Sequence, residues 1–318
     1  MPSYRIVVAS NKYTEASLEV LRSVGEITQV PPDGEAFDVA MAEADALLIR
    51  TQTEVTEETI ARAPKLRVIG RGGVGVDNID LNACRARGID VVYTPGAATD
   101  AVADLAVGLM LSTLRGLSNA AKLVQAGEFS TARRTLIGRE IGSMTLGIVG
   151  LGRIGRAVGQ RCADGFGMQV QYHDVLPVEA PSYQAQSASF DEVLKLSDIV
   201  SLHVPLTHLT KGMINSSTLA MMRPGSILIN TSRGAVVDTS ALVESLSSGR
   251  LAGAGLDVTY PEPLPADHPL LSMPSAHVTA HMGSNTRAAQ DRMSDVVHDV
   301  VRVLCGEKPE FSVLQDRY

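Results

Sequence analysis

The stretch of residues 145–155, Thr-Leu-Gly-Ile-Val-Gly-Leu-Gly-Arg-Ile-Gly, decides how this chain folds. It begins with a short apolar run, which is typical of a buried parallel strand. It continues into the pattern G-x-G-x-x-G at Gly150, Gly152 and Gly155. The first glycine permits a tight turn, the second lets the backbone approach a pyrophosphate, and the third lets the next helix lie close to the strand. The free N–H groups at the start of that helix then favour a bound phosphate.

The residues after the glycines complete a nucleotide-binding unit. A helix is compatible with residues 156–164, and a second apolar run at 168–172 leads to Asp174. A carboxylate at this place accepts hydrogen bonds from ribose hydroxyls, and its charge repels a 2′-phosphate. Residues 175–177 offer no cation to hold such a phosphate. The glycines alone also fit a turn without a ligand, but strand, helix, second strand and acid together predict an NAD site and not a P-loop.

Length and composition describe an ordinary globular protein with room for two domains. The chain has 318 residues, 45% hydrophobic and 20% charged, and its net charge of −7 argues against a nucleic-acid or acidic-membrane surface. No apolar run reaches the length of a transmembrane helix. Residues 1–8 lead directly into a strand and lack the apolar stretch of a signal peptide, so we expect none. Cys84, Cys162 and Cys305 are too few and too far apart for disulfides or a metal site. We therefore expect a cytoplasmic protein with reduced thiols.

Strand-like and helical patterns alternate along the chain, which predicts an α/β fold with two doubly wound parallel sheets. A final helix at 285–304 should return to the first sheet, which otherwise lacks a covering helix. We therefore expect a Rossmann NAD-binding domain, residues 99–285, inserted in a flavodoxin-like substrate-binding domain, residues 1–98 and 286–318. The expected strands lie at residues 5–9, 27–30, 46–49, 68–70, 91–93, 146–149, 169–172, 199–203, 226–230, 253–258 and 276–279.

A long helical pattern, about 100–126, precedes a polar segment at 127–143. The helix is rich in Ala, Val, Leu, Gly and Met, which suggests burial on more than one face. The polar segment carries Arg133, Arg134 and Arg139. It fits either an arm that packs on a second subunit or a solvated loop.

Three polar residues beyond the glycine pattern could carry chemistry. Arg233 and His281 each follow an expected strand, and Glu262 stands between two prolines. In open α/β sheets, ligands bind beyond the carboxyl ends of the strands. Hydride transfer from a 2-hydroxy acid needs a base for the hydroxyl proton, a carboxylate that orients this base, and a guanidinium that clamps the substrate carboxylate. The three residues match these needs in type, although each one alone is a common surface charge, loop acid or inert histidine.

At these residues the chain resembles the D-isomer-specific 2-hydroxyacid dehydrogenases, and within them most closely the phosphoglycerate dehydrogenases. The resemblance implies that His281 is the acid/base residue, Glu262 its acid partner and Arg233 the substrate arginine. It also implies homodimers through the second domain, which fits the 100–143 region. The motifs that carry the resemblance span nearly the whole chain, at residues 68–78, 150–155, 202–207, 229–238, 256–258 with 262–265, and 279–283.

The resemblance also implies which residues contact the cofactor and the substrate. Asp257 would contact the nicotinamide carboxamide, and the backbone at Val74 and Gly75 would hold the substrate carboxylate. No metal is expected. The residues implied to contact NAD are Gly150, Gly152, Arg153, Ile154, Gly155, Asp174, His203, Val204, Pro205, Thr231 and Asp257.

Several departures from the family pattern weaken the substrate assignment. Ala280 stands where a proline usually precedes the catalytic histidine, Ala98 replaces an asparagine, and Asp104 replaces a glutamate. The sequence stops at Tyr318, so we expect a short form without the serine-binding regulatory domain that many phosphoglycerate dehydrogenases carry.

One stretch bears directly on the substrate. Arg50 and Thr51 follow an expected strand and match the place where phosphoglycerate dehydrogenases have an anion-binding arginine and hydroxyl. Together with Arg71 they could hold a distal phosphate or sulfonate. The alternative is that Arg50 is simply a charge at the end of a strand.

The sequence therefore predicts reversible, NAD-dependent oxidation of a small anionic D-2-hydroxy acid. The leading candidate is 3-phosphoglycerate, oxidised to 3-phosphohydroxypyruvate in serine biosynthesis. A glyoxylate or hydroxypyruvate reductase is the alternative within the same class. An NAD-sensing, corepressor-like binding protein is the alternative of another class. No nucleic-acid or membrane partner is expected.

Overall fold

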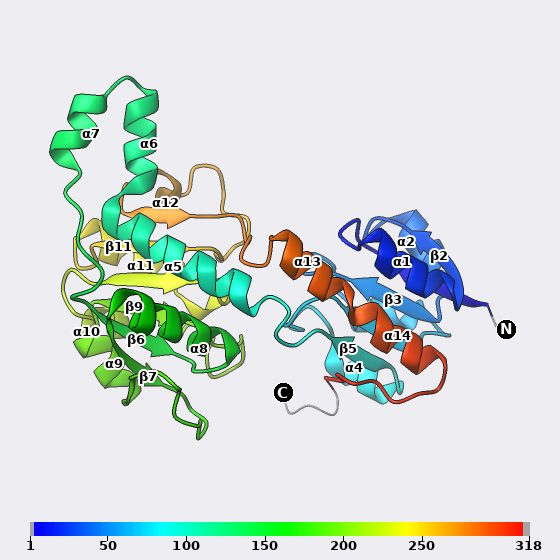
Figure 1. Cartoon of the computed structure of the whole chain (residues 1–318). Helices are drawn as coiled ribbons and strands as arrows, with labels where there is room; N and C mark the ends of the chain where they lie inside the picture. The colour runs from blue at the N-terminus through cyan, green and yellow to red at the C-terminus, as the bar shows by residue number, and fades with distance from the viewer. Residues whose placement is uncertain (1–2, 314–318) are drawn as a thin grey trace. The chain divides into compact units, whose positions relative to one another are not determined.

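The computed structural model describes residues 3–313 (Figure 1). These residues form two compact units, with the chain passing between them after Ala98 and again after Ser284. The first unit contains residues up to Ala98 and those from Asn285 onward, and the second unit contains residues 99–284. Both units are built of parallel strands with helices between them, so the predicted α/β fold with two parallel sheets is confirmed.

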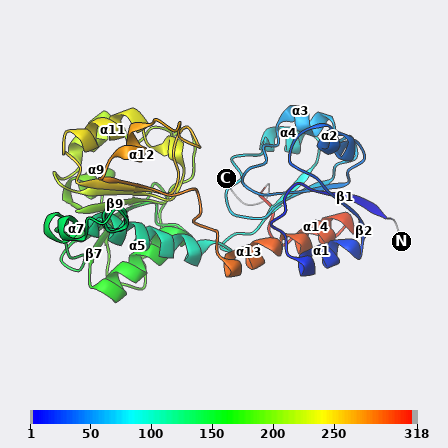
Figure 2. The ribbon, with the colours of Figure 1, turned by 90° about the horizontal axis from the view of Figure 1, so that it is seen from above.

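The first unit has a five-stranded parallel sheet in the order β2-β1-β3-β4-β5. Side chains alternate between its faces: Ile6 and Val8 join one hydrophobic core, and Val7 joins the other. Helices α1 and α14 cover the first of these faces, and α2, α3 and α4 lie on the other (Figure 2). The strands are β1 (Tyr4–Val8), β2 (Gly25–Gln29), β3 (Ala46–Ile49), β4 (Val68–Arg71) and β5 (Asp90–Tyr93), and the helices are α1 (Glu15–Arg22), α2 (Glu35–Ala42), α3 (Glu57–Ala61), α4 (Leu81–Ala86), α13 (Arg287–Ser294) and α14 (Val296–Leu304).

The last helical pattern of the chain packs on this first sheet. It is divided at Asp295 into α13 and α14, where one continuous helix was expected. Val300 of α14 lies so close to β4 that a Cβ at Gly70 would come within 2.5 Å of its side chain. The glycine therefore lets the helix sit directly against the strand.

The second unit has a seven-stranded parallel sheet in the order β12-β11-β10-β9-β6-β7-β8. The strand order reverses between β6 and β9, which is the place where such sheets bind ligands. Helices α5 and α8 cover one face, and α9 to α12 cover the other. The strands are β6 (Thr145–Val149), β7 (Gln169–His173), β8 (Gln186–Ser187), β9 (Ile199–Leu202), β10 (Ile227–Asn230), β11 (Gly253–Leu256) and β12 (Ala276–Val278), and the helices are α5 (Thr99–Arg115), α6 (Leu117–Gln125), α7 (Phe129–Thr135), α8 (Arg153–Gln160), α9 (Phe190–Leu196), α10 (Ser216–Met221), α11 (Thr239–Ser247) and α12 (Pro269–Ser272), with a π-helical turn η1 (Arg161–Gly165) and a 3-10 turn η2 (Gly234–Val236).

The expected single helix at 100–126 is wrong, because α5 and α6 meet at a bend of 62°. Gly116 at the bend has φ 60, a left-handed conformation that ends α5. The bend is held by Ser118, whose Oγ lies 2.9 Å from Nδ1 of the buried His277. No single described helix is long and apolar enough to cross a membrane. Only the bent pair of α5 and α6, counted together, has sufficient length and apolar composition.

The polar segment 127–143 is not a plain loop, because it contains α7. Helices α6 and α7 lie side by side and form a hairpin that projects from the rest of the second unit (Figure 1). We call residues 117–137 the arm.

Candidate active site

The glycine turn joins β6 to α8 at the point where the strand order reverses. Gly150 has φ 93, as a tight turn requires. A Cβ at Gly155 would lie 2.1 Å from the carbonyl oxygen of Gly150, so only glycine allows α8 to approach the turn this closely. A Cβ at Gly152 would meet nothing within 4 Å, and no side chain caps the start of α8 there. The turn thus has an open position beside free N–H groups, which fits a pyrophosphate. Arg153 and Ile154 form the first turn of this helix.

Asp174 follows β7 and fastens the glycine turn to the end of that strand. Its Oδ2 accepts a hydrogen bond from the Leu151 N–H at 2.8 Å, and its Oδ1 accepts one from the Leu176 N–H at 2.9 Å. An ionised carboxylate has about four acceptor positions, so Asp174 can still accept bonds from ribose hydroxyls.

Two buried polar atoms lie at the carboxyl ends of β9 and β10. Nδ1 of His203 and Oγ1 of Thr231 are both buried and have no hydrogen-bond partner among the described residues. Burial lowers the pKa of His203 to about 4, so its ring is neutral at pH 7. Its Nε2 lies 2.9 Å from Oγ of Ser201. Val204 and Pro205 follow His203 directly. Because buried polar atoms are normally paired, the two free atoms fit a bound polar group such as a dinucleotide.

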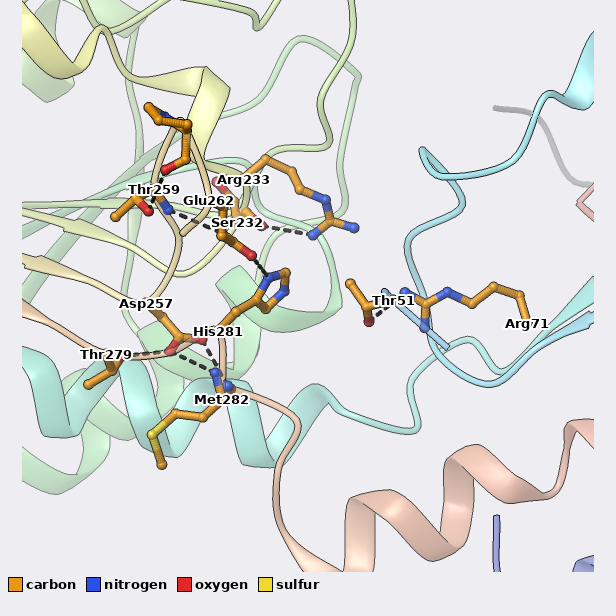
Figure 3. A network of polar contacts seen from close by, with 12 residues as sticks. Thr51, Arg71, Ser232, Arg233, Asp257, Thr259, Glu262, Thr279, His281 and Met282 are labelled. Atoms are coloured by element: carbon orange, nitrogen blue, oxygen red, sulfur yellow. Dashed lines mark hydrogen bonds and ion pairs between the residues drawn. The ribbon is translucent and has the colours of Figure 1, made fainter. Parts of the chain in front are cut away.

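The structure brings Glu262 and His281 together, although 18 residues separate them in the chain. His281 Nδ1 lies 2.6 Å from Oε1 of Glu262, and the other carboxylate oxygen, Oε2, accepts a bond from the Thr259 N–H at 3.2 Å (Figure 3). Partial burial alone would raise the pKa of Glu262. The bonds from His281 and Thr259 and the nearby charge of Arg233 outweigh this effect and lower it. Glu262 is therefore a carboxylate at neutral pH.

Arg233 lies in the same group of side chains (Figure 3). The turn that presents it is held by Asn230, whose Nδ2 donates to the Arg233 carbonyl at 2.9 Å and whose Oδ1 accepts from the Ser232 N–H at 3.0 Å. A Cβ at Gly234 would lie 1.9 Å from the carbonyl oxygen of Thr259. The backbone after Arg233 therefore lies directly against the backbone of the loop that carries Glu262. This close packing of the two loops keeps Arg233 near Glu262.

Sequence reasoning missed the residues that support this group. Asn230, Thr259 and Thr279 make hydrogen bonds that hold the loops of Arg233, Glu262 and His281, yet none was singled out. For Asn230 a signal was present, because an Asn followed by Thr-Ser directly after a strand favours a turn closed by the asparagine side chain. For Thr259 and Thr279 the sequence holds no such signal.

In the first unit, the Arg50 side chain is buried and already donates several hydrogen bonds within the protein. It is 6% exposed, its Nη1 donates to the Gly72 carbonyl at 3.1 Å, and its Nη2 donates to the Lys12 carbonyl and to Oγ of Ser294, both at 2.9 Å. Its guanidinium also lies 4.4 Å from the centre of the Tyr13 ring. These contacts tie α13 to the sheet, so Arg50 has a structural task whether or not it meets an anion.

Arg71 and Thr51 form a second polar pair in this unit. Arg71 is buried and donates from Nη1 to the Gly72 carbonyl at 2.8 Å and from Nη2 to Oγ1 of Thr51 at 3.1 Å. Thr51 is exposed, whereas Val74 and Gly75 are partly buried. Of the residues expected to bind substrate, Thr51 is therefore the most open to solvent.

Comparison with known proteins shows which family this chain belongs to. Residues 107–283 match the model for the NAD-binding domain of D-isomer specific 2-hydroxyacid dehydrogenases. The D-3-phosphoglycerate dehydrogenase of Mycobacterium leprae is 39% identical over 306 residues, which cover 95% of this chain and 57% of that protein. The glyoxylate reductase of Thermococcus litoralis is 40% identical over 296 residues, which cover 91% of this chain and 88% of that protein.

A solved structure gives the same result for the fold. The TT0316 protein of Thermus thermophilus matches with a TM-score of 0.91 and 39% identity, over 97% of this chain and 99% of that one. The chain thus spans little more than half the length of the M. leprae protein but nearly all of TT0316. Because the family model matches more than half of the chain, this protein belongs to the D-isomer-specific 2-hydroxyacid dehydrogenases, a family whose cofactor is NAD.

Proposed function

We propose that this protein oxidises a small anionic D-2-hydroxy acid reversibly, with His281 as the residue that takes up and returns the proton. The observation that carries the proposal is the 2.6 Å contact between His281 Nδ1 and Glu262 Oε1. The contact commits Nδ1 to Glu262, so that Nε2 is the ring nitrogen left to face a substrate hydroxyl. A test of the whole proposal is a measurement of NADH absorbance with a panel of 2-oxo acids.

Each residue of the group has a distinct task in this proposal. Bound NAD would supply the acceptor for the hydride that leaves C2 of the substrate. His281 takes the hydroxyl proton on Nε2, and the ionised Glu262 stabilises the positive imidazolium that forms. Arg233 binds the substrate carboxylate and polarises the reacting oxygen. In the direction of reduction, His281 returns the proton to that oxygen.

We propose that the second unit holds NAD through the residues at the carboxyl ends of its strands. The open position at Gly152 and the N–H groups of Arg153, Ile154 and Gly155 would receive the pyrophosphate. Asp174 would receive the ribose. The residues around the nicotinamide side would be His203, Val204, Pro205, Thr231 and Asp257.

We propose 3-phosphoglycerate as the leading substrate, bound at its phosphate by Thr51 and Arg71 and at its carboxylate by the backbone at Val74 and Gly75. The relative named D-3-phosphoglycerate dehydrogenase supports this choice, and the relative named glyoxylate reductase supports the alternative. Faster reduction of glyoxylate or hydroxypyruvate than of 3-phosphohydroxypyruvate would overturn it. NADH binding without turnover of any 2-oxo acid would favour an NAD-sensing binding protein. A cytoplasmic location and a role in serine biosynthesis stay predictions.

The substitution Thr51→Glu tests the substrate directly, because it places a negative charge on an exposed position beside Arg71. We expect kcat/KM for 3-phosphohydroxypyruvate to fall about tenfold, which corresponds to about 1.4 kcal/mol of repulsion. Glyoxylate has no phosphate, so its kcat/KM should change less than about twofold. Thr51→Gln is the control of similar size without charge. Equal losses for both substrates in the Glu variant would contradict a phosphate site at Thr51.

We propose a homodimer formed through the arm. Four of its large apolar side chains are exposed: Leu117 at 53%, Val124 at 50%, Phe129 at 62% and Ile137 at 90%. Apolar side chains gathered in this way on a projecting hairpin are typical of a surface that another chain covers. The partner that fits the proposal is a second copy of this chain.

The double substitution Phe129→Glu with Ile137→Glu tests the arm. Charges cannot be buried unpaired in an apolar interface, so the variant should have the mass of one chain by light scattering at concentrations where the unmodified protein has the mass of two. Val39→Glu is the control, because Val39 is 68% exposed but lies in α2. An unmodified protein with the mass of one chain would show that the arm is a solvated hairpin instead.

A further inference from the structure

Asp257 is 2% exposed, and its carboxylate lies inside the turn that carries His281. Its Oδ1 accepts hydrogen bonds from Oγ1 of Thr279 at 2.6 Å and from the Met282 N–H at 2.9 Å. Its Oδ2 accepts one from the Gly283 N–H at 2.8 Å. The Asp257 carbonyl accepts a further bond from the His281 N–H at 2.8 Å. The turn from residue 279 to 283 is therefore wrapped around one acidic residue (Figure 3).

The backbone of His281 has an unusual conformation. Its φ is 49, and it is the only residue other than glycine with a positive φ within the described range 3–313. A residue with a Cβ adopts this left-handed conformation at a cost in free energy, and the conformation persists only where the surroundings enforce it. The two N–H groups that follow, of Met282 and Gly283, converge on the Asp257 carboxylate. Consecutive N–H groups that converge in this way form a nest for an anion.

The nest connects two neighbouring strands of the sheet. Asp257 follows β11 directly, and the His281 turn follows β12, which pairs with β11 in parallel. The conformation at His281 sets the direction in which its side chain leaves the backbone, and this direction leads to the 2.6 Å contact with Glu262. The Asp257 carboxylate thus supplies the charge-assisted bonds that can hold an unfavourable backbone conformation in place.

We propose that Asp257 is a positioning residue for His281, in addition to any contact with the cofactor. This inference rests on the proposed function of His281 for its effect on turnover. The two tasks of Asp257 are compatible, because Oδ1 takes two donors and Oδ2 takes one, which leaves one acceptor position on Oδ2. Gly283 fits the same arrangement: a Cβ there would come within 3.1 Å of Oδ2 and 3.2 Å of the Val102 side chain.

The experiment compares Asp257→Asn with the unmodified enzyme, by crystallography and by kinetics. The Met282 and Gly283 N–H groups bond to different oxygens of Asp257. In asparagine one of these two oxygens is replaced by an NH2 group, which is a donor and faces one of the two N–H groups without accepting its bond. We expect residue 281 to leave the left-handed region and the contact with Glu262 to break. We also expect kcat to fall about a hundredfold with a changed pH profile, while Kd for NADH rises less than about tenfold.

Two further variants separate the loss of the N–H bonds from other effects of the Asp257 substitution. Thr279→Val is the graded comparison, because it removes only the hydroxyl donor to Oδ1 and leaves both N–H bonds, so kcat should fall by much less than in Asp257→Asn. Gly283→Ala crowds Oδ2 without altering Asp257 and should give a kcat between those of Thr279→Val and the Asn variant. It also decides the question if Asp257→Asn does not fold.

The proposal is overturned if φ at residue 281 and the contact with Glu262 both persist in the Asn variant while only Kd for NADH rises. Asp257 would then act on the cofactor alone. Failure of the proposed function is a separate result, since it appears as absent turnover in the unmodified protein. In that case, the crystallographic comparison still decides whether Asp257 positions His281.

Discussion

Replacement of His281 by Gln is expected to lower kcat for every 2-oxo acid that the protein reduces by about a thousandfold, with little change in NADH binding. Glutamine is close to histidine in length, but its amide cannot act as an acid or a base near neutral pH. The loss should therefore fall on the proton-transfer step. Glu262, which loses its 2.6 Å partner, remains a partly exposed carboxylate that water can solvate. The measurement is single-turnover oxidation of NADH, with binding followed separately by NADH fluorescence.

The control for this variant is His298→Gln, because His298 is an exposed histidine of α14 in the first unit. It should keep full activity. Turnover by the His281 variant within about tenfold of the unmodified enzyme would remove the acid/base assignment, since general acid–base catalysis contributes more than this. A parallel loss of NADH binding would instead mean that the substitution disturbs the nearby turn.

Replacement of Gly152 by Ala is expected to raise Kd for NADH about a hundredfold without loss of stability. A Cβ at this position meets nothing within 4 Å in the protein, and Gly152 has φ −73, which alanine adopts readily. The added methyl group should therefore leave the unfolding midpoint unchanged. It would occupy the space in which the pyrophosphate approaches the backbone, and about 3 kcal/mol of lost binding is the upper end of what overpacking costs.

Two other glycines serve as comparisons. Gly155→Ala should lower the stability of the protein itself, because its Cβ would lie 2.1 Å from the Gly150 carbonyl oxygen. Gly165→Ala should leave both stability and binding unchanged, because its Cβ would also meet nothing within 4 Å and it lies at the far end of η1. Unchanged NADH affinity in the Gly152 variant would show that the cofactor does not approach the backbone there.

Much of the fold could be predicted because its signals are local. The nucleotide-binding pattern from Gly150 to Asp174 lies in one continuous stretch, and the apolar runs of the strands are visible without knowledge of their neighbours. The errors arose where a local signal is ambiguous. A single glycine such as Gly116 is tolerated within a helix, so the sequence did not reveal the 62° bend. The segment that contains α7 is polar and weakly periodic, so the sequence left an arm and a solvated loop both open.

The residues of the candidate active site divide in the same way. The residue types could be read directly from the sequence: a histidine and an arginine after strands, an acid between prolines, and an Asp174 that follows the second strand of the nucleotide unit. Three contacts became visible only in the folded chain: Glu262 meets His281, Arg50 makes buried hydrogen bonds, and Asp257 fills the turn at His281. The physical reason is that these contacts depend on which strands are neighbours and on where their ends meet. Neighbouring ends such as those of β11 and β12 are brought together by packing of the whole sheet, which no local stretch of sequence specifies.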